Sequence, residues 1–154
     1  MGTDIHLYVE VRRDGAWHLQ PMPRSAPLDF THDGYEGWSG RNYAVFSILC
    51  GVRGALEPLV APRGLPEDLS RELVAAQEGG SDGVWLGEHS FSWWGYEDIL
   101  ALAESKKTCW ASDGYVYTYA EIAQNFLAWA ARDVRPLVEK YGADNVRIVF
   151  GFDS

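Results

Sequence analysis

The sequence predicts an α+β fold in which a small antiparallel sheet, formed by an N-terminal hairpin and a C-terminal strand, packs with about four helices. Apolar and polar residues alternate at both ends of the chain, whereas apolar residues recur at helical spacing in the middle. Strands and helices do not alternate regularly, which disfavours a parallel sheet. No internal repeat or linker divides the 154 residues, so we expect a single compact domain over 1–154.

The first and last segments are the clearest strands. Apolar residues occupy every second position of Thr3–Arg12, the pattern of a strand with one buried face. Asp14-Gly15 then indicates a two-residue hairpin turn, and Ala16–Gln20 returns as a short second strand. Asn145–Asp153 alternates in the same way as the first strand. We expect the first and last strands to lie at the centre of the sheet.

Four segments between these strands have helical spacing and suitable ends. They are Arg41–Val52, Glu67–Gln77, Tyr96–Ser105 and Thr118–Tyr141. Pro136 lies inside the last segment, and proline removes a helical hydrogen bond. We therefore expect a kink or break over Arg132–Arg135.

Two longer segments have no periodicity and are predicted to be loops. Pro21–Gly40 is rich in glycine, proline and aromatic residues, and it includes His32-Asp33. A loop of this length in a compact domain is either functional or disordered, and its aromatic residues favour function. Gly87–Gly95 is the second loop, and Thr108–Tyr117 is expected to form an irregular hairpin.

The composition narrows the classes of function. A net charge of −9 disfavours binding to nucleic acid, because phosphate backbones are also anionic, and it disfavours docking on an anionic membrane. No segment resembles a secretory signal or a membrane span, so we expect a cytoplasmic protein. Cys50 and Cys109 have neither metal-ligand spacing nor a disulfide framework. Aromatic residues make up 14% of the chain, which supplies material for a binding pocket.

Asp4 and His6 are the first candidate site residues, because residues two apart in a strand project from the same face. If the last strand pairs with the first, Asp153, Gly151 and Arg147 come to that face. A carboxylate and an imidazole can share Zn²⁺ or Mn²⁺, or the carboxylate can orient the imidazole as a general base. The alternative is an ordinary solvent-facing strand. Gly151 indicates a close approach by a ligand, or it relieves crowding under an aromatic residue such as Trp38 or Trp110.

His89 is the second candidate and lies in a segment that precedes a predicted helix. A helix N-terminus with nearby hydroxyl groups, such as that of Ser90, is suited to an anion. Serine at such a position is more often a cap or turn residue, and a histidine beside Trp93 and Trp94 can be a packing residue. His89 therefore acts as a ligand or base only if it reaches His6.

Arginine and aromatic residues near the predicted loops are candidates for binding a ligand. Arg41 and Tyr43 can hold a phosphate or stack on a base, although an internal salt bridge is the more common role of such an arginine. Tryptophans in loops often line a pocket or an interface. The predicted ligand-binding set is Arg41, Tyr43, Trp38, Ser90, Trp93, Trp94 and Arg147. The predicted metal set is Asp4, His6, His89 and Asp153, with His6 and His89 as the catalytic residues of an enzyme.

Several segments together resemble an uncharacterised family of small proteins found in bacteriophage and bacterial genomes, whose members begin Met-Gly-x-Asp-Ile-His. The resemblance is carried by Met1–His6, Arg41–Tyr43, Val52-Arg53, Gly64–Pro66, His89–Trp93 and Val146–Asp153. Thr3 occupies a position where the family often has a cysteine, so a thiolate ligand is not expected there. The resemblance implies a phage-like accessory role and involves the same histidines.

Three functions remain. The favoured one is a phage-type accessory protein that binds, and so sequesters, a small aromatic or nucleotide-like ligand in a pocket lined by tryptophan and histidine. The first alternative is a hydrolase in which Asp4, His6, His89 and Asp153 hold a metal ion that activates water. The second is a protein-interaction domain with an aromatic contact surface. Binding ranks first because the sequence contains no phosphate loop, nucleophile elbow or complete metal motif. Self-association is compatible with all three.

Overall fold

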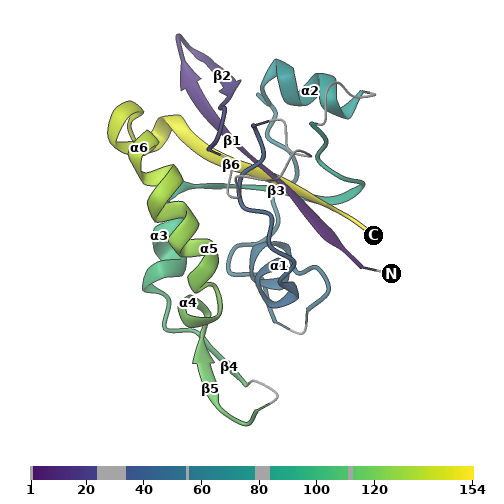
Figure 1. Cartoon of the computed structure of the whole chain (residues 1–154), viewed down its shortest axis with the longest axis vertical. Coiled ribbons are helices and arrows are strands. Elements are labelled where there is room, and N and C mark those ends of the chain that lie inside the picture. The colour runs from purple at the N-terminus through teal and green to yellow at the C-terminus, as the bar shows by residue number, and fades with distance from the viewer. Residues whose placement is uncertain (1, 24–33, 55, 79–83, 111–112) are drawn as a thin grey trace.

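The computed structural model describes residues 2–23, 34–54, 56–78, 84–110 and 113–154, and it confirms a single α+β domain (Figure 1). Its main sheet is antiparallel and has the strand order β2-β1-β6-β3. The strands are β1 (Asp4–Arg13), β2 (Ala16–Leu19), β6 (Val146–Asp153) and β3 (His89–Gly95). The N-terminal hairpin and the C-terminal strand therefore form the sheet as the sequence predicts, with β1 and β6 at its centre.

The predicted turn joins β1 to β2. Asp14 and Gly15 both have positive φ angles, 53° and 79°, as a two-residue hairpin turn requires. Beyond β2, Glu36 forms an isolated bridge with Tyr8, so part of the predicted loop Pro21–Gly40 continues along the same side of β1. His32 and Asp33 lie outside the described residues.

The first face of the sheet carries the larger core. Ile5, Leu7, Val9 and Val11 of β1 join alternate residues of β6 there. The helices on this face are α1 (Tyr43–Cys50), α3 (Tyr96–Glu104), α4 (Tyr119–Ile122), α5 (Gln124–Trp129) and α6 (Arg135–Tyr141) (Figure 1). Their apolar side chains complete the core.

The predicted interruption of the last helix is confirmed. A π-helical turn, η1 (Ala130–Val134), separates α5 from α6, and Pro136 lies at the start of α6. The missing N–H of proline explains why the regular hydrogen-bond pattern changes immediately before it. After α6, a 3₁₀ turn, η2 (Ala143–Asn145), leads into β6.

The second face carries a smaller apolar cluster. Tyr8 and Val149 from the sheet pack there against α2 (Arg71–Gln77) and against Leu86. This helix begins later than predicted, because Ser70 caps its N-terminus and accepts a hydrogen bond from the backbone N–H of Leu73. The remaining elements, β4 (Thr108–Trp110) and β5 (Val116–Thr118), form the expected hairpin, which projects away from the main sheet (Figure 1).

The prediction that Gly87–Gly95 is a loop is wrong, because most of it forms strand β3. The pairing of β3 with β6 shifts by one residue between His89 and Ser92, and Ser90 has a φ of 60° at this bulge. The extra residue breaks the alternation by which a strand is recognised in a sequence. No helix in the described part of the chain is long and apolar enough to cross a membrane.

Candidate functional site

Four of the predicted site residues meet at the end of the sheet where the two termini lie. Asp4 and Asp153 are paired directly across β1 and β6. Arg41 binds Asp4 with two hydrogen bonds, from Nε to Oδ1 and from Nη2 to Oδ2, each 2.9 Å long. Nε2 of His6 lies 2.7 Å from Oδ2 of Asp153. Two opposed carboxylates repel one another, so Arg41 and His6 stabilise this end of the sheet.

The terminal cluster of Asp4, His6, Arg41 and Asp153 resembles part of a general-base site. A carboxylate that holds one imidazole nitrogen fixes the ring and leaves the other nitrogen for chemistry. The ring of His6 also lies beside the ring of Trp85, whose centroid is 4.8 Å away. No described hydroxyl or thiol is hydrogen-bonded to His6. The cluster therefore holds an oriented histidine without a nucleophile.

His89 does not join this cluster. Its ring nitrogens lie 2.8 Å from Oγ of Ser90 and 3.1 Å from Oγ of Ser154. In the sheet, His89 is opposite Phe152, whereas His6 is opposite the adjacent Gly151. No group of three or more His, Cys, Asp or Glu side chains suited to a metal ion occurs among the described residues. The four predicted ligands Asp4, His6, His89 and Asp153 are thus not brought together.

Three other predicted ligand-binding residues have structural contacts. The hydroxyl of Tyr43 accepts a hydrogen bond from the backbone N–H of Thr3. Trp38 is buried and contacts Phe46 and Phe126 edge-on, although it also lines a groove of about 480 Å³ with Trp129. Trp94 is fully buried in the larger core.

The close approach predicted at Gly151 is made by the protein itself. A Cβ atom at this position would overlap the carbonyl oxygen of Leu86 and would lie 2.6 Å from Cδ1 of Phe91. The aromatic neighbour is therefore Phe91 rather than Trp38, and the side chain of Trp110 lies outside the described part of the structure. The glycine allows the segment that carries Leu86 to lie directly on the sheet.

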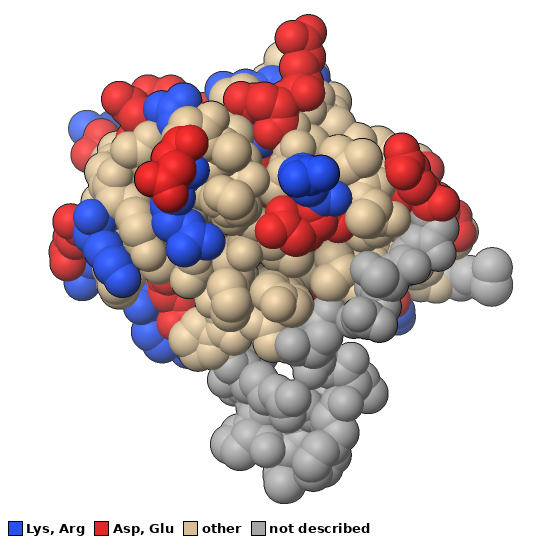
Figure 2. Space-filling model, turned by 90° about the horizontal axis from the view of Figure 1, so that it is seen from above, with Lys and Arg blue, Asp and Glu red and all other residues tan. Residues whose placement is uncertain are grey.

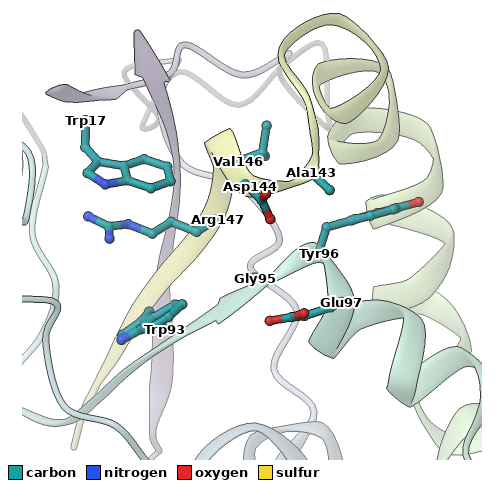
Figure 3. A pocket seen from close by; sticks show the side chains of 9 residues that line it. All are labelled: Trp17, Trp93, Gly95, Tyr96, Glu97, Ala143, Asp144, Val146 and Arg147. Atoms are coloured by element: carbon teal, nitrogen blue, oxygen red, sulfur yellow. The ribbon is translucent and has the colours of Figure 1, made fainter. Parts of the chain in front are cut away.

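The remaining predicted residues, Trp93 and Arg147, meet at the opposite end of the second face. The guanidinium of Arg147 lies between the indole rings of Trp17 and Trp93, at 3.9 Å and 5.9 Å from their centroids (Figure 3). Arg12 and Arg63 lie 5.3 Å and 4.6 Å from the same two rings. Cations on both indoles hold these side chains in fixed positions.

Two carboxylates neutralise Arg147. Its Nε donates to Oε1 of Glu10 over 2.7 Å, and its Nη1 donates to Oδ1 of Asp68 over 2.8 Å. The hydrogen bond from Arg147 holds the pKa of Asp68 below its ordinary value, and a hydrogen bond from Trp17 acts in the same direction. Because Arg147 is only 6% exposed and is paired twice, it supplies little attraction for an anionic ligand.

Two cavities beside this stack share Trp93 and Arg147. The first has a volume of about 210 Å³. Its lining comprises Trp17, Trp93, Gly95, Tyr96, Glu97, Ala143, Asp144, Val146 and Arg147 (Figure 3). The second has a volume of about 540 Å³ and is bordered by Arg63, Leu65, Pro66, Glu67 and Asp68 as well as the two shared residues. Trp93 and Arg147 therefore form a wall common to both cavities, and Trp17 lines the first.

The first cavity has an acidic rim. The carboxylates of Glu97 and Asp144 are exposed, and neither has a hydrogen bond or ion pair with another described residue. Arg12 donates to the backbone carbonyl of Asp144 and to the side chain of Asn145, rather than to the Asp144 carboxylate. Seen from above the molecule, acidic and basic side chains are interspersed and no continuous basic area is visible on that face (Figure 2).

Sequence reasoning missed most of this second site. Trp17, Glu10, Asp68, Tyr96, Glu97 and Asp144 were not among the predicted residues. The signal for Glu10 was present, because the register that pairs Asp4 with Asp153 also pairs Glu10 with Arg147. Trp17 stands opposite Arg12 in the hairpin, so the turn at Asp14-Gly15 places it on the same face. Asp68 and Asp144 come from irregular segments, whose position no periodicity indicates.

Comparison of the chain with protein-family models, curated proteins and solved structures found no match.

Proposed function

We propose that the protein is a binding protein that takes up a small planar molecule in the cavity beside Arg147. The observation that carries the proposal is the stack of Trp17, Arg147 and Trp93, which lines the first cavity and of which Trp93 and Arg147 also line the second. Concave sites lined by aromatic residues and a few polar groups are the usual form of small-molecule sites. The contacts that hold the stack are all made within the protein, so the wall exists before any ligand arrives.

The rigidity of this wall favours binding. Trp17 is fixed by a 3.0 Å hydrogen bond from its Nε1 to Asp68 as well as by the guanidinium of Arg147. The backbone carbonyl of Trp93 accepts a 2.9 Å hydrogen bond from Arg63, which is itself bound to Asp98. A ligand that meets preorganised side chains loses less entropy in ordering them. The wall consists of two indole rings and a guanidinium group, all of them planar, so a planar ligand can stack against it.

As the sequence predicted, the proposed binding site is lined by tryptophan, but it contains neither of the two candidate histidines. His6 and His89 line neither of the two cavities. A phosphate-bearing ligand is disfavoured, because Arg147 already binds Glu10 and Asp68. A nucleobase or another flat heterocycle fits the same wall without phosphate. The phage-type accessory role, in which the bound molecule is withheld from the host, rests on the sequence resemblance alone.

A metal-dependent hydrolase has less support. His89 lies apart from the other three predicted ligands, and the oriented His6 has no nucleophile among its described contacts. An interaction domain draws support only from scattered exposed apolar side chains such as Trp85 and Tyr115. Neither alternative explains the paired cavities.

Filling the first cavity tests the proposal. Gly95 lines this cavity and has no positive φ, and the nearest heavy atom to an added Cβ would be 3.9 Å away. A Gly95→Leu variant should therefore fold and block the cavity. Ala103→Leu on the exposed side of α3 is the matched control. A library of small planar compounds is screened by ligand-observed NMR against both variants and the wild type. We expect compounds that bind the wild type and the control but not Gly95→Leu; a library in which no compound shows this pattern contradicts the proposal.

A further inference from the structure

We infer that the molecule bound beside Arg147 is an organic cation, a flat ring that carries an ammonium or amidinium group and is held by Glu97 and Asp144. The inference rests on the proposed function and names the chemical class of its ligand. It follows from the charges that line the cavity, from the aromatic side chains beside them and from the volume.

The charges of the lining favour a cation. Most acids near this site are already paired: Arg147 binds Glu10 and Asp68, and Arg63 binds Asp98 with two hydrogen bonds of 2.7 and 3.1 Å. Glu97 and Asp144 have no such partner among the described residues. The rim of the cavity thus carries two carboxylates whose charge is not neutralised by a contact.

Neighbouring arginines do not cancel these two charges. Glu97 is close enough to Arg63 to contribute to the raised pKa of that guanidinium, but the hydrogen bonds of Arg63 go to Asp98 and to the backbone of Trp93. Arg12 is hydrogen-bonded near Asp144 only through backbone and amide oxygens. The chain as a whole carries a net charge of −9, which adds a long-range attraction for cations.

The aromatic side chains of the cavity suit the same ligand. Figure 3 shows Arg147 between Trp17 and Trp93, whereas the ring of Tyr96, which also lines the cavity, extends away from this stack and packs against the larger core. The indoles of Trp17 and Trp93 are therefore the flat surfaces against which the ring of the ligand can lie. The indoles add affinity, and the two carboxylates supply the preference for positive charge.

The volume limits the size of the ligand. The cavity holds about 210 Å³, which is below the range of roughly 300–1,000 Å³ that is usual for drug-sized ligands. A molecule of one or two rings with a short charged arm fits this volume. The charged group then lies at the rim, where the carboxylates remain partly hydrated.

Three probes with the same ring system test the charge preference: tryptamine, 3-methylindole and indole-3-acetate, which are cationic, neutral and anionic at pH 7. Dissociation constants are measured by ligand-observed NMR against the wild type, the Glu97→Gln/Asp144→Asn double variant and Glu104→Gln. The last variant removes an exposed acid of α3 that does not line the cavity. We expect tryptamine to bind the wild type and Glu104→Gln at least 10-fold more tightly than indole-3-acetate. The double variant should reduce this ratio to below 3-fold.

The outcomes separate this inference from the proposed function. If all three probes bind equally and Gly95→Leu abolishes their binding, the cavity is a ligand site but the cation preference is overturned. If tryptamine binds the double variant as tightly as the wild type, the roles of Glu97 and Asp144 are likewise overturned. If no probe binds and the library screen is also negative, the proposed function fails and the inference fails with it.

Discussion

Glu10 and Arg147 form a buried ion pair across the two central strands, with Oε1 and Nε 2.7 Å apart and exposed fractions of 0% and 6%. The other carboxylate oxygen of Glu10 accepts a 2.7 Å hydrogen bond from the backbone N–H of Ser70, the residue that caps α2. One carboxylate thus connects the stacked wall of the cavities, the centre of the sheet and the helix on its second face.

Removal of this carboxylate should destabilise the protein strongly. Glu10→Gln leaves the buried charge of Arg147 with Asp68 alone, and breaking a buried pair typically costs about 3–5 kcal/mol. The expected loss, because Asp68 remains, is about 3 kcal/mol in the free energy of unfolding. Urea denaturation measures this loss. Glu139→Gln, which breaks an exposed pair with Arg135, is the control and should cost less than about 1 kcal/mol. Equal effects of the two substitutions would contradict this role of Glu10.

Asp68 should contribute to stability only above acidic pH. Arg147 lowers the pKa of Asp68 from its ordinary value of 3.8, so the folded state holds the deprotonated form more tightly than the unfolded state does. This contribution is present above pH 3.8 and is lost as the pH falls through the lower pKa of the folded state. The side chain is 66% exposed, so the effect is modest. The free energy of unfolding, measured between pH 7 and pH 2, should decrease less steeply with falling pH for Asp68→Asn than for the wild type. Asp14→Asn, in an exposed turn, is the control, and a wild-type slope in Asp68→Asn would contradict the prediction.

The close contact at Gly151 predicts a large effect from a single methyl group. Gly151→Ala should lower the free energy of unfolding by about 1–3 kcal/mol, because the added Cβ overlaps the Leu86 carbonyl and crowds Phe91. Gly95→Ala adds the same group where the nearest heavy atom is 3.9 Å away, and its effect should be smaller. Thermal unfolding of the two variants provides the comparison. The reverse order of stability would show that the segment carrying Leu86 does not lie on the sheet in this way.

Cys50 should be unreactive in the folded protein. Burial raises the pKa of its thiol to about 11, and its Sγ lies 3.2 Å from the carbonyl oxygen of Ser90. At pH 8 only about one thiol in a thousand is then the reactive thiolate. In a Cys109→Ser variant, labelling by a maleimide at pH 8 should be slow until denaturant is added. Rapid labelling of the native variant would mean that Cys50 is accessible.

The sequence patterns predicted the centre of the fold because one face of each central strand is formed almost entirely by apolar residues. Alternation in β1 and β6 is regular, and the pairing of Asp4 with Asp153 follows once these strands are placed side by side. The turn at Asp14-Gly15 was predictable for a local reason, since both residues adopt positive φ. Strand β3 was not predictable in this way, because the bulge at Ser90 interrupts its alternation.

The candidate site was predicted only in part. Trp93 and Arg147 were identified, but their surroundings depend on Asp68 and Asp144, which lie outside the regular strands and α-helices. Trp38 and Trp94 were expected to line a pocket because they were placed in loops. Both are buried in the larger core, Trp94 as part of β3, although Trp38 also borders a groove. His6 and His89 pair with adjacent residues of β6, Gly151 and Phe152. Because adjacent residues of a strand point to opposite faces of the sheet, the two histidines do not meet.

The most direct test of the proposed binding site is a ¹H–¹⁵N NMR titration of the uniformly labelled wild-type protein with tryptamine. If the ligand occupies the first cavity, the largest shifts will fall on the indole N–H signals of Trp17 and Trp93 and on the backbone amides of 95–97 and 143–147. Shifts that centre on the indole of Trp85 and the amides of Asp4, His6 and Asp153, with those of the cavity unchanged, would contradict the account and place the binding site in the terminal cluster.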